Sequence, residues 1–320
     1  MKKNKLETLQ LPQDRRKFLK NAGALGLGLL ASPLLTDIFA QNTPAIPKKE
    51  GMSDKLIPFE DPNAPWTMTH SGQEQHTIAE IESAYKEMTP VHYYPASNRW
   101  LNLPIVNKAL TSKNSSLNIV MLGDSIINDT YRSQWDNLVL QPAYPNCKIS
   151  CVAIVRGSTG CWYYKEGNNI EKYVLPHNPD LLIIGGISQK DDIDSIREVI
   201  KQVQSARKCD VLLMTKSYGE VSEKVTRRYA DPYLDYKPGV VENGWSYDIP
   251  TDPQDYRRRL LELAQETKSG FLDMTAPWGA YIRQSGKPLD YFKRDIIHAN
   301  VKGEQIIGRI LAAHLSPVKL

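Results

Sequence analysis

Two short motifs, far apart in the chain, carry residue types that together could perform nucleophilic catalysis. Gly123-Asp124-Ser125 lies in the first half of the sequence, and Asp295-Ile296-Ile297-His298 lies close to its end. A serine hydroxyl needs a base that takes its proton, and the base needs an acceptor that orients it. An i, i+3 spacing in a turn or first helical turn puts Asp295 and His298 on one side. We therefore predict that Asp295 holds Nδ1–H of His298 while Nε2 faces Ser125. The alternative for this second motif alone is a surface histidine behind an Asp that caps the next helix.

A short apolar stretch leads into the serine. Leu117–Leu122 is apolar and partly β-branched, with Ser and Asn before it and Gly123 after it, which is typical of a buried parallel strand. A helical pattern with Tyr131, Trp135 and Leu138 follows. A serine at the carboxyl end of such a strand points out of the sheet, where open α/β sheets bind their ligands.

In this order, the two motifs resemble those of the SGNH (GDSL-type) hydrolase family. The glycine of the family's second motif is matched by Gly160 in Arg156-Gly157-Ser158-Thr159-Gly160, with Gly157 as the alternative. The third motif is normally Gly-x-Asn after a strand opened by Pro-Asp. Pro179-Asp180 is present, but Gly185-Gly186-Ile187-Ser188-Gln189 follows without an Asn. The resemblance covers about Leu117 to the C-terminus and departs from the family at this third motif.

The resemblance implies both a fold and a reaction. The expected fold is a flavodoxin-like three-layer α/β/α sandwich with a mainly parallel five-stranded sheet. The expected reaction is ester hydrolysis, in which Ser125 attacks, His298 is the general base and then the acid, and Asp295 fixes the tautomer of His298. Backbone N–H groups of Ser125 and Gly160 would bind the oxyanion. Asp124 is expected within the same substrate-binding set.

The missing Asn leaves the third oxyanion donor open. Counted from Pro-Asp, the family's Asn falls at Gln189, which carries the same amide on a stem one methylene longer. Ser188 could instead donate through its hydroxyl. In a third interpretation, both residues simply begin the following helix, with Asp191 or Asp192 as its cap. We favour Gln189.

Strands alternate with helices along the rest of the chain. Further strand candidates are Ile149–Val155, Leu181–Ile184, Val211–Met214 and Phe271–Asp273. Helices are expected at Ile78–Met88, after Asp191/Asp192, after Asp252-Pro253 with Gly270 just past the end, and after Asn300. Such alternation predicts a parallel sheet covered by helices on both faces.

The first forty residues have the pattern of an export signal. A twin-arginine motif, Asp14-Arg15-Arg16-Lys17-Phe18-Leu19-Lys20, precedes an apolar, glycine-rich run from Ala22 to Leu35. Ala40 then offers a small residue for cleavage before Gln41. A basic tail that stays in the cytosol is the alternative. We predict a signal peptide over 1–40, a linker over 41–65 and a hydrolase domain with an N-terminal helical extension over 66–320, in a periplasmic or secreted protein.

The net charge and the cysteine spacing limit which partners and cofactors we expect. Residues 1–40 hold seven Lys/Arg and three Asp/Glu, so their net charge equals the +4 of the whole chain. The remainder is formally neutral, and we expect neither nucleic acid nor, once the signal is cleaved, a membrane as partner. The cysteines show neither Cys-x-x-Cys nor metal-ligand spacing, so we predict no metal and no cofactor, and buried free thiols at Cys147, Cys151, Cys161 and Cys209.

Aromatic residues suggest the substrate class. Trp162-Tyr163-Tyr164 directly follows Gly160 and could line the pocket, although two of the three could belong to the core. Lys216–Thr251 is rich in Tyr and could form a lid or sugar-stacking wall, or its aromatics could pin a long loop to the body. With export, these features favour O-acetyl esters of carbohydrates, as in many exported members of the family.

Other functions stay open at this point. The altered third motif fits a non-catalytic carbohydrate-binding relative. A cell-envelope acyltransferase is a second alternative, although such relatives often place the Asp/His motif before the serine. A lipase-type acylhydrolase would want a more apolar lid than Lys216–Thr251 offers. The sequence does not indicate the oligomeric state.

Export through the twin-arginine route can be tested directly. Replacing Arg15 and Arg16 with lysine should leave the full-length precursor in the cytoplasm, because this route reads the arginine pair. Fractionation followed by immunoblotting measures the outcome, with unchanged localisation after Lys2→Arg and Lys3→Arg as the control. A processed form of the lysine variant outside the inner membrane would exclude this route.

Overall fold

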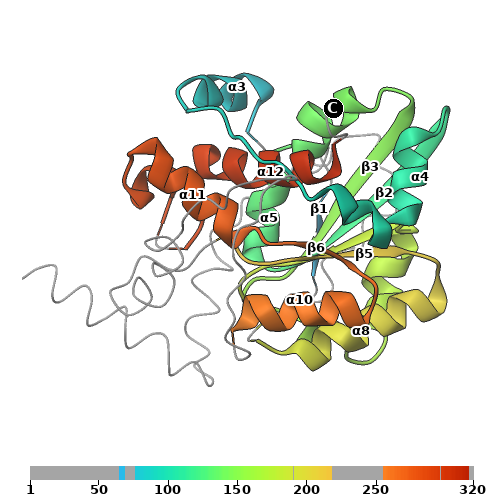
Figure 1. Ribbon diagram of the computed structural model, residues 1–320. Coiled ribbons are helices and arrows are strands. Elements are labelled where there is room, and N and C mark those ends of the chain that lie inside the picture. The colour runs from blue at the N-terminus through green and yellow to red at the C-terminus, as the bar shows by residue number, and fades with distance from the viewer. Residues whose placement is uncertain (1–64, 69–75, 190, 218–254, 296, 317–320) are drawn as a thin grey trace, which may run out of the picture. The chain divides into compact units, whose positions relative to one another are not determined.

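The computed structural model describes residues 65–68, 76–189, 191–217, 255–295 and 297–316 (Figure 1). All of them belong to one compact unit, Pro58–Leu320. The predicted signal peptide, almost all of the predicted linker and the part of the Lys216–Thr251 loop after Ser217 lie outside the described residues.

The centre of this unit is a six-stranded sheet. Its strands are β1 (Trp66–Met68), β2 (Ser115–Gly123), β3 (Cys147–Val155), β4 (Leu181–Ile184), β5 (Asp210–Met214) and β6 (Gly270–Leu272), in the order β1-β3-β2-β4-β5-β6. Strands β2 to β6 are parallel, and β1 pairs antiparallel with the edge of β3. The predicted five-stranded parallel sheet is therefore confirmed, and the short strand β1 is an addition that the sequence did not suggest.

Helices fill the connections. They are α3 (Ile78–Lys86), α4 (Pro104–Thr111), α5 (Ser125–Arg132), α6 (Gln141–Ala143), α7 (Cys161–Tyr164), α8 (Ile193–Ala206), α10 (Tyr256–Glu266), α11 (Thr275–Ser285) and α12 (Val301–Leu315). Short 3₁₀ or π turns lie at Ser97–Asn102 (η1), Asp136–Leu140 (η2), Ile170–Val174 (η3), Leu175–His177 (η4) and Leu289–Phe292 (η5).

Polar caps fix where the helices begin. Asp192 caps α8 by accepting Ser195 N–H at 3.0 Å, and Asn300 caps α12, as predicted. The prediction for α10 was wrong, because its cap is Asp255 and the helix begins at Tyr256. Asp252 and Pro253 lie outside the described residues. The residue expected just past this helix, Gly270, is the first residue of β6.

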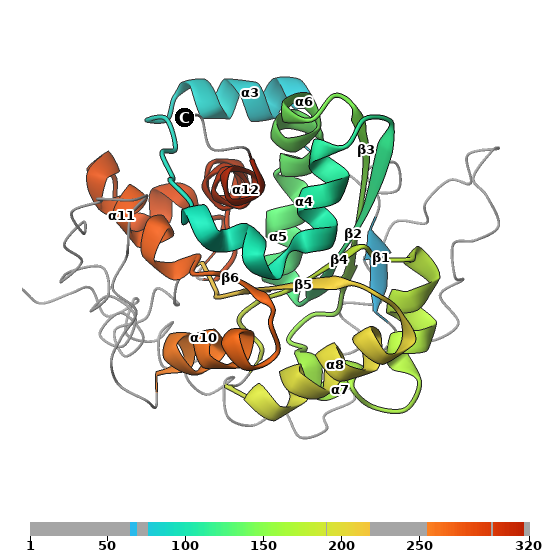
Figure 2. The ribbon, with the colours of Figure 1, turned by 45° about the vertical axis from the view of Figure 1, so that its right-hand side comes forward.

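The sheet separates two apolar cores, which makes the unit a three-layer sandwich (Figure 2). Helices α4, α5, α11 and α12 cover one face, and α7, α8 and α10 cover the other. All four residues of β4 are buried, which is the continuous apolar run expected of a parallel strand covered on both sides. The first core includes Leu103, Met121, Trp135, Trp278, Ile306 and Leu311, and the second includes Leu122, Tyr164, Leu182, Ile196, Val203 and Leu260.

The strand order identifies where a ligand would bind. Strand β2 has β3 on one side and β4 on the other, so the direction of the chain's progress across the sheet reverses at β2. Open α/β sheets bind ligands in the crevice outside the carboxyl ends of their strands at such a reversal. Gly123, at the end of β2, is in register with Val155 of β3, and Leu122 is in register with Ile184 of β4. The loops after β2, β3 and β4 therefore meet at one edge.

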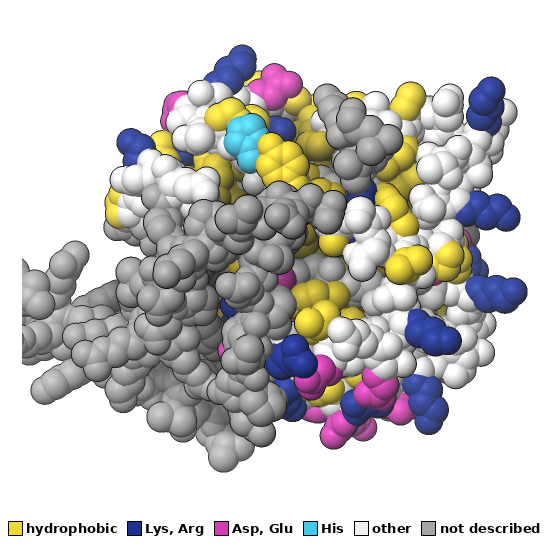
Figure 3. Space-filling model, in the orientation of Figure 1, with side chains coloured by type: hydrophobic (Ala, Val, Ile, Leu, Met, Phe, Trp, Pro, Cys, Tyr) yellow, Lys and Arg dark blue, Asp and Glu magenta, His cyan; other side chains and the backbone are white. Residues whose placement is uncertain are grey.

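The face of the described unit seen in Figure 3 carries side chains of both charges. Over α8 and α10, acidic and basic side chains are interspersed, and hydrophobic side chains occur in small groups (Figure 3). Of the helices in the described ranges, none is long and apolar enough to cross a membrane.

Close packing of α12 against the residues that follow α5 gives a testable prediction. A Cβ added at Gly308 would lie 2.0 Å from Ser133 Oγ and 2.5 Å from its Cβ, and that hydroxyl is itself held by a 2.6 Å bond to Thr130 O. Gly308→Ala should lower the free energy of unfolding by about 1–2 kcal/mol, because overpacking outweighs the better helix propensity of Ala. Urea denaturation measures this. Gly157→Ala, with nothing within 4 Å of its added Cβ, is the matched control and should change stability little. Equal stability of the two variants would contradict the packing argument.

Candidate functional site

The structure brings the three predicted catalytic side chains together. Nε2 of His298 lies 2.8 Å from Ser125 Oγ, and Nδ1 of His298 lies 2.7 Å from Asp295 Oδ2. The imidazole therefore bridges hydroxyl and carboxylate with one nitrogen each, an arrangement in which the carboxylate accepts Nδ1–H and leaves Nε2 free to accept a proton. The Ser–His pair joins residues 173 positions apart in the sequence.

Asp295 is held by its own turn. Its Oδ1 accepts the backbone N–H groups of Ile297 and His298, each at 2.7 Å, while Oδ2 accepts from the His298 ring. Partial burial pushes the pKa of Asp295 upward, but these hydrogen bonds outweigh it and leave the pKa below its ordinary value. Asp295 is therefore ionised at neutral pH. The predicted alternative, in which Asp295 caps the following helix, does not hold, because Asn300 is that cap.

Ser125 owes its position to the turn between β2 and α5. The strand ends at Gly123, Asp124 is the N-cap, and Ser125 is the first residue of the helix. The hydroxyl of Tyr164 donates to Gly123 O at 2.9 Å, which fixes the turn from below. A Cβ at Gly123 would lie 2.5 Å from Gly185 O, so only glycine allows the two loops to approach this closely.

Asp124 connects the nucleophile turn to the loop after β4. Its Oδ1 accepts Ile126 N–H at 2.9 Å, and its Oδ2 accepts the N–H groups of Ile187 at 2.7 Å and Ser188 at 2.6 Å. Burial raises the pKa of Asp124, and these hydrogen bonds oppose the rise. Gly186 has φ +100°, and a Cβ there would lie 2.5 Å from the Asp124 carboxylate. Asp124 is only 1% exposed, so it positions the site. The sequence-based expectation that Asp124 contacts a substrate is not met.

Gln189 does not occupy the place predicted for it. The side chain is 3% exposed, its Oε1 accepts Cys161 N–H at 2.9 Å, and its Nε2 donates to Gly185 O at 2.8 Å. The carboxamide therefore links the loops after β3 and β4 inside the protein, and the expectation that it faces a substrate oxyanion is not met. Ser188 binds Asp124 through its backbone N–H at 2.6 Å, and an oxyanion role for its hydroxyl stays a prediction.

Two backbone donors remain at the site. Among the residues that the structure describes, the N–H groups of Ser125 and Gly160 have no hydrogen-bond acceptor. Gly160 is the extended N-cap of α7 and lies against the loop after β4, since a Cβ there would be 2.6 Å from Ser188 O. Both donors are at helix N-termini at the carboxyl edge of the sheet, where an anion is favoured. Gly157, the alternative for the second motif, has open space around it.

The aromatic triplet divides between core and surface. Tyr164 is fully buried under the nucleophile turn, whereas Trp162 and Tyr163 are half-buried. The indole N–H of Trp162 donates to Ser188 O at 3.1 Å, and the guanidinium of Arg156 stacks 4.5 Å over the Tyr163 ring. Trp162 and Tyr163 therefore stand beside the loops that carry Gly160 and Ser188.

Sequence reasoning missed a buried charged group behind His298. Asp129 on α5 and Glu304 on α12 are both fully buried, and Arg294 pairs with each of them. The available signal was an Asp one helical turn after the serine, on a helix face otherwise directed into the core. A single sequence does not show where its partner lies.

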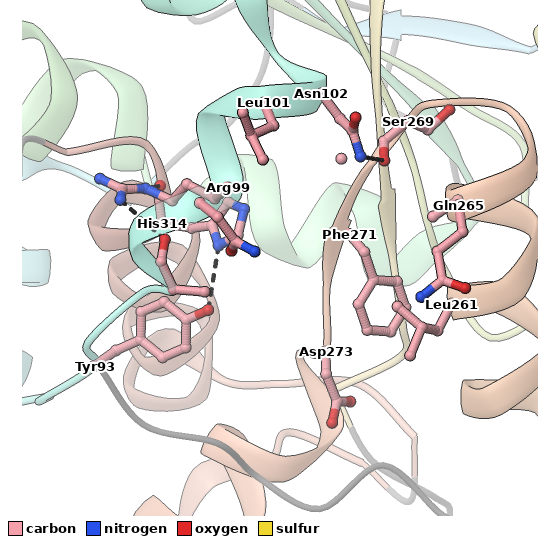
Figure 4. A pocket seen from close by; sticks show the side chains of 14 residues that line it. Tyr93, Arg99, Leu101, Asn102, Leu261, Gln265, Ser269, Phe271, Asp273 and His314 are labelled. Carbon is pink, nitrogen blue, oxygen red and sulfur yellow. Dashed lines mark hydrogen bonds between the residues drawn. The ribbon is translucent and has the colours of Figure 1, made fainter. Parts of the chain in front are cut away.

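A separate pocket of about 370 Å³ lies beside the edge strand β6 (Figure 4). Its described lining includes Tyr93, Arg99, Asn102 and His314, and none of the residues of the Ser125 site. Asn102 donates to Ser269 O at 3.1 Å and Arg99 donates to His314 O at 2.6 Å. Burial, with the nearby charge of Arg99, lowers the pKa of His314 to about 3, so its imidazole is neutral. These polar groups serve the fold.

In the described part of the chain, no three His, Cys, Asp or Glu side chains are grouped so that they could hold a metal ion. The four cysteines are free and buried, as predicted.

The structural role of Gln189 can be separated from a catalytic one. Gln189→Ala would leave Cys161 N–H and Gly185 O unpaired and open a cavity, so we expect unfolding free energy to fall by about 2–4 kcal/mol. Gln202→Ala, which removes a half-buried amide bonded to Lys165 O, is the matched control and should cost less than about 1 kcal/mol. Urea denaturation measures both. A stable Gln189→Ala variant with a hundredfold lower kcat would instead reinstate Gln189 as an oxyanion donor.

In comparisons with known proteins, no protein-family model matches the sequence, and no curated protein sequence matches it. Among solved structures, the chain is similar to a two-domain esterase (CEX) active on acetylated mannans, with 14% identity, a TM-score of 0.47, and coverage of 68% of this chain and 52% of that one. It is also similar to Axe2, an acetyl-xylooligosaccharide esterase from Geobacillus stearothermophilus, with 18% identity, a TM-score of 0.48, and coverage of 66% and 98%. The chain thus spans about half the length of the first and nearly all of the second.

Proposed function

We propose that this protein is an exported serine esterase of the SGNH type that hydrolyses O-acetyl groups on carbohydrates. The observation that carries the proposal is the continuous hydrogen-bonded series from Ser125 Oγ through the His298 ring to Asp295, with separations of 2.8 and 2.7 Å. These are the distances at which proton transfer from a nucleophile to its base takes place.

The acylation step follows from this geometry. Ser125 Oγ attacks the acyl carbonyl carbon while its proton moves to Nε2 of His298, which becomes positively charged. Asp295 accepts Nδ1–H throughout and stabilises that charge without taking the proton. Its lowered pKa keeps it ionised down to acidic pH, so protonation of Asp295 does not limit activity near neutrality. His298 then gives its proton to the departing sugar oxygen.

The carbonyl oxygen becomes negatively charged in the tetrahedral intermediate. The N–H groups of Ser125 and Gly160 are the donors that we assign to it, because neither has an acceptor among the described residues. Ser125 is the first residue of α5, and Gly160 is the N-cap of α7. Each such donor is worth about 3 kcal/mol in the transition state. Two donors from backbone atoms would make the missing family Asn dispensable. Water activated by His298 then releases the acid from the acyl-serine in a second, analogous step.

The substrate class rests on the surroundings of the serine. Half-buried Trp162 and Tyr163 offer aromatic surface beside Gly160, on which a sugar ring can stack. A polysaccharide outside the cytoplasm is consistent with the predicted twin-arginine signal. A non-catalytic carbohydrate-binding relative and an acyltransferase or lipase-type acylhydrolase are separate outcomes of the experiment below.

Alanine variants of the three residues test the mechanism. Ser125→Ala and His298→Ala should each lower kcat by about 10³-fold or more, and Asp295→Ala by an equal or smaller factor, because the base persists but loses its orientation. Acid release from acetylated xylan, acetylated mannan, p-nitrophenyl acetate and a long-chain p-nitrophenyl ester measures activity, with the chain from Gln41 onward as the reference.

Each outcome has a distinct meaning. Glycan binding without acid release would indicate a binding protein, preference for the long-chain ester would indicate a lipase, and acetyl transfer to an added glycan in excess of hydrolysis would indicate an acyltransferase. Full activity of Ser125→Ala with an unchanged melting temperature would exclude the mechanism.

A further inference from the structure

A second carboxylate lies behind the segment that carries His298. Asp129 follows Ser125 by one turn of α5 and is fully buried. Its Oδ2 accepts the backbone N–H of Ala299 at 2.9 Å, and Ala299 is the residue next to His298. One rigid helical turn therefore carries both the nucleophile and an acceptor for the backbone of its base.

Arg294 contacts the same segment and binds both Asp129 and Ala299. Its Nη1 lies 2.9 Å from Asp129 Oδ1 and donates to Ala299 O at 2.8 Å. Its backbone N–H donates to His298 O at 3.1 Å, and Lys293 and Ala299 form an antiparallel bridge. Both backbone groups of Ala299 are thus bonded, one to a side chain of α5 and the other to a side chain of its own loop.

The charges around Asp129 come from every element packed there. Glu304 of α12 is fully buried and lies 3.4 Å from Arg294 Nη1, 3.3 Å from Arg132 Nε and 3.2 Å from His76 Nε2. Burial raises the pKa of Asp129 to about 6, the charge of Arg294 opposes the rise and that of Glu304 adds to it, and His298 also opposes it. At neutral pH Asp129 is mostly ionised.

The raised pKa of Asp129 means that ionisation of this carboxyl costs folding free energy. The folded-state pKa of about 6 exceeds the ordinary value of 3.8, so between these values the folded protein keeps a proton that the unfolded chain has lost. Stability therefore falls as pH rises through this window, and the ionised carboxylate counts against folding at neutral pH. Groups held in an unfavourable charge state beside a site are typical of function.

We propose that Asp129 is a positioning residue for the reaction assigned above, and that with Arg294 it holds the backbone of Ala299 so that His298 Nε2 stays in line with Ser125 Oγ. This inference depends on the proposed function for its reaction. The two residues touch no reacting atom and act only through the loop. Their loss should therefore reduce the rate of proton transfer and leave substrate binding unchanged.

The test uses Asp129→Asn, Arg294→Gln and their combination. Asp129→Asn keeps shape and one acceptor but places an amide where Arg294 expects a carboxylate. The control is Asp210→Asn, a buried carboxyl that accepts Val106 N–H at 2.9 Å at the opposite edge of the sheet. Hydrolysis of p-nitrophenyl acetate at pH 8 gives kcat and KM. A fluorophosphonate then labels the serine to completion, and the labelled fraction measures how much of the protein is competent. Dividing kcat by this fraction gives kcat per titrated serine. The labelling rate is measured alongside.

We expect kcat per titrated serine to fall roughly 10- to 100-fold in both single variants, with KM within about twofold of wild type. The double variant should lose less than the product of the two factors, because the residues act on one another. Asp210→Asn should retain wild-type kcat. The side chain of Arg294 is 37% exposed, so Arg294→Gln should fold. This variant tests the inference if Asp129→Asn does not fold.

Two results would overturn the inference. In the first, the variants keep wild-type kcat per titrated serine and lose only the labelled fraction or the melting temperature, which is what a merely structural role predicts. In the second, KM rises as much as kcat falls, which assigns the pair to substrate binding. If wild type hydrolyses no ester, the proposed function fails, and the fluorophosphonate labelling rates still compare the variants. A wild-type chain that is neither active nor labelled would contradict both the proposed function and the positioning role of Asp129.

Discussion

The buried carboxylate of Asp124 is the acceptor on which three loops depend. Its oxygens take one N–H from the first turn of α5 and two from the loop after β4, while Gln189 of that same loop reaches Cys161 beyond β3. The ends of β2, β3 and β4 are thereby tied together through backbone groups. Because backbone donors cannot change with side-chain substitution, this arrangement fixes the N–H of Ser125 and of Gly160 independently of the residues that surround them.

The carboxylates buried beneath the site cost free energy to remove from water, so each of them needs hydrogen-bond or ion-pair partners. Asp124, Asp129 and Glu304 are each at most 1% exposed, yet each has N–H or guanidinium partners. An unpaired buried charge would cost several kcal/mol, so these partners are obligatory. Buried ion pairs add little net stability compared with apolar residues, but they permit only one relative placement of the elements that carry them. The placement fixed here is that of α5, α12 and the loop between η5 and α12.

The sequence predicted those elements of the structure that are determined by residues close together in the chain. The five parallel strands, the caps Asp192 and Asn300, and the turn that joins Asp295 to His298 all follow from neighbouring residues. Contacts set by distant backbone were not predictable. Gln189 has the right chemical group for an oxyanion donor, but Gly185 O and Cys161 N–H compete for it from separate loops. Strand β1 is three residues long and pairs only because the edge of β3 is open, which no local pattern records.

The wide separation of the serine and the histidine along the chain has a consequence for synthesis. Ser125 and most of the sheet leave the ribosome long before α12, whose Ile306, Ile307, Ile310 and Leu311 complete the first core. The segment that bears His298 is anchored by that helix through Glu304 and by the Asn300 cap. A nascent or C-terminally truncated chain thus holds Ser125 without the hydrogen bond from its hydroxyl to His298. The series of hydrogen bonds through His298 to Asp295 forms only after α12 has been synthesised and packed.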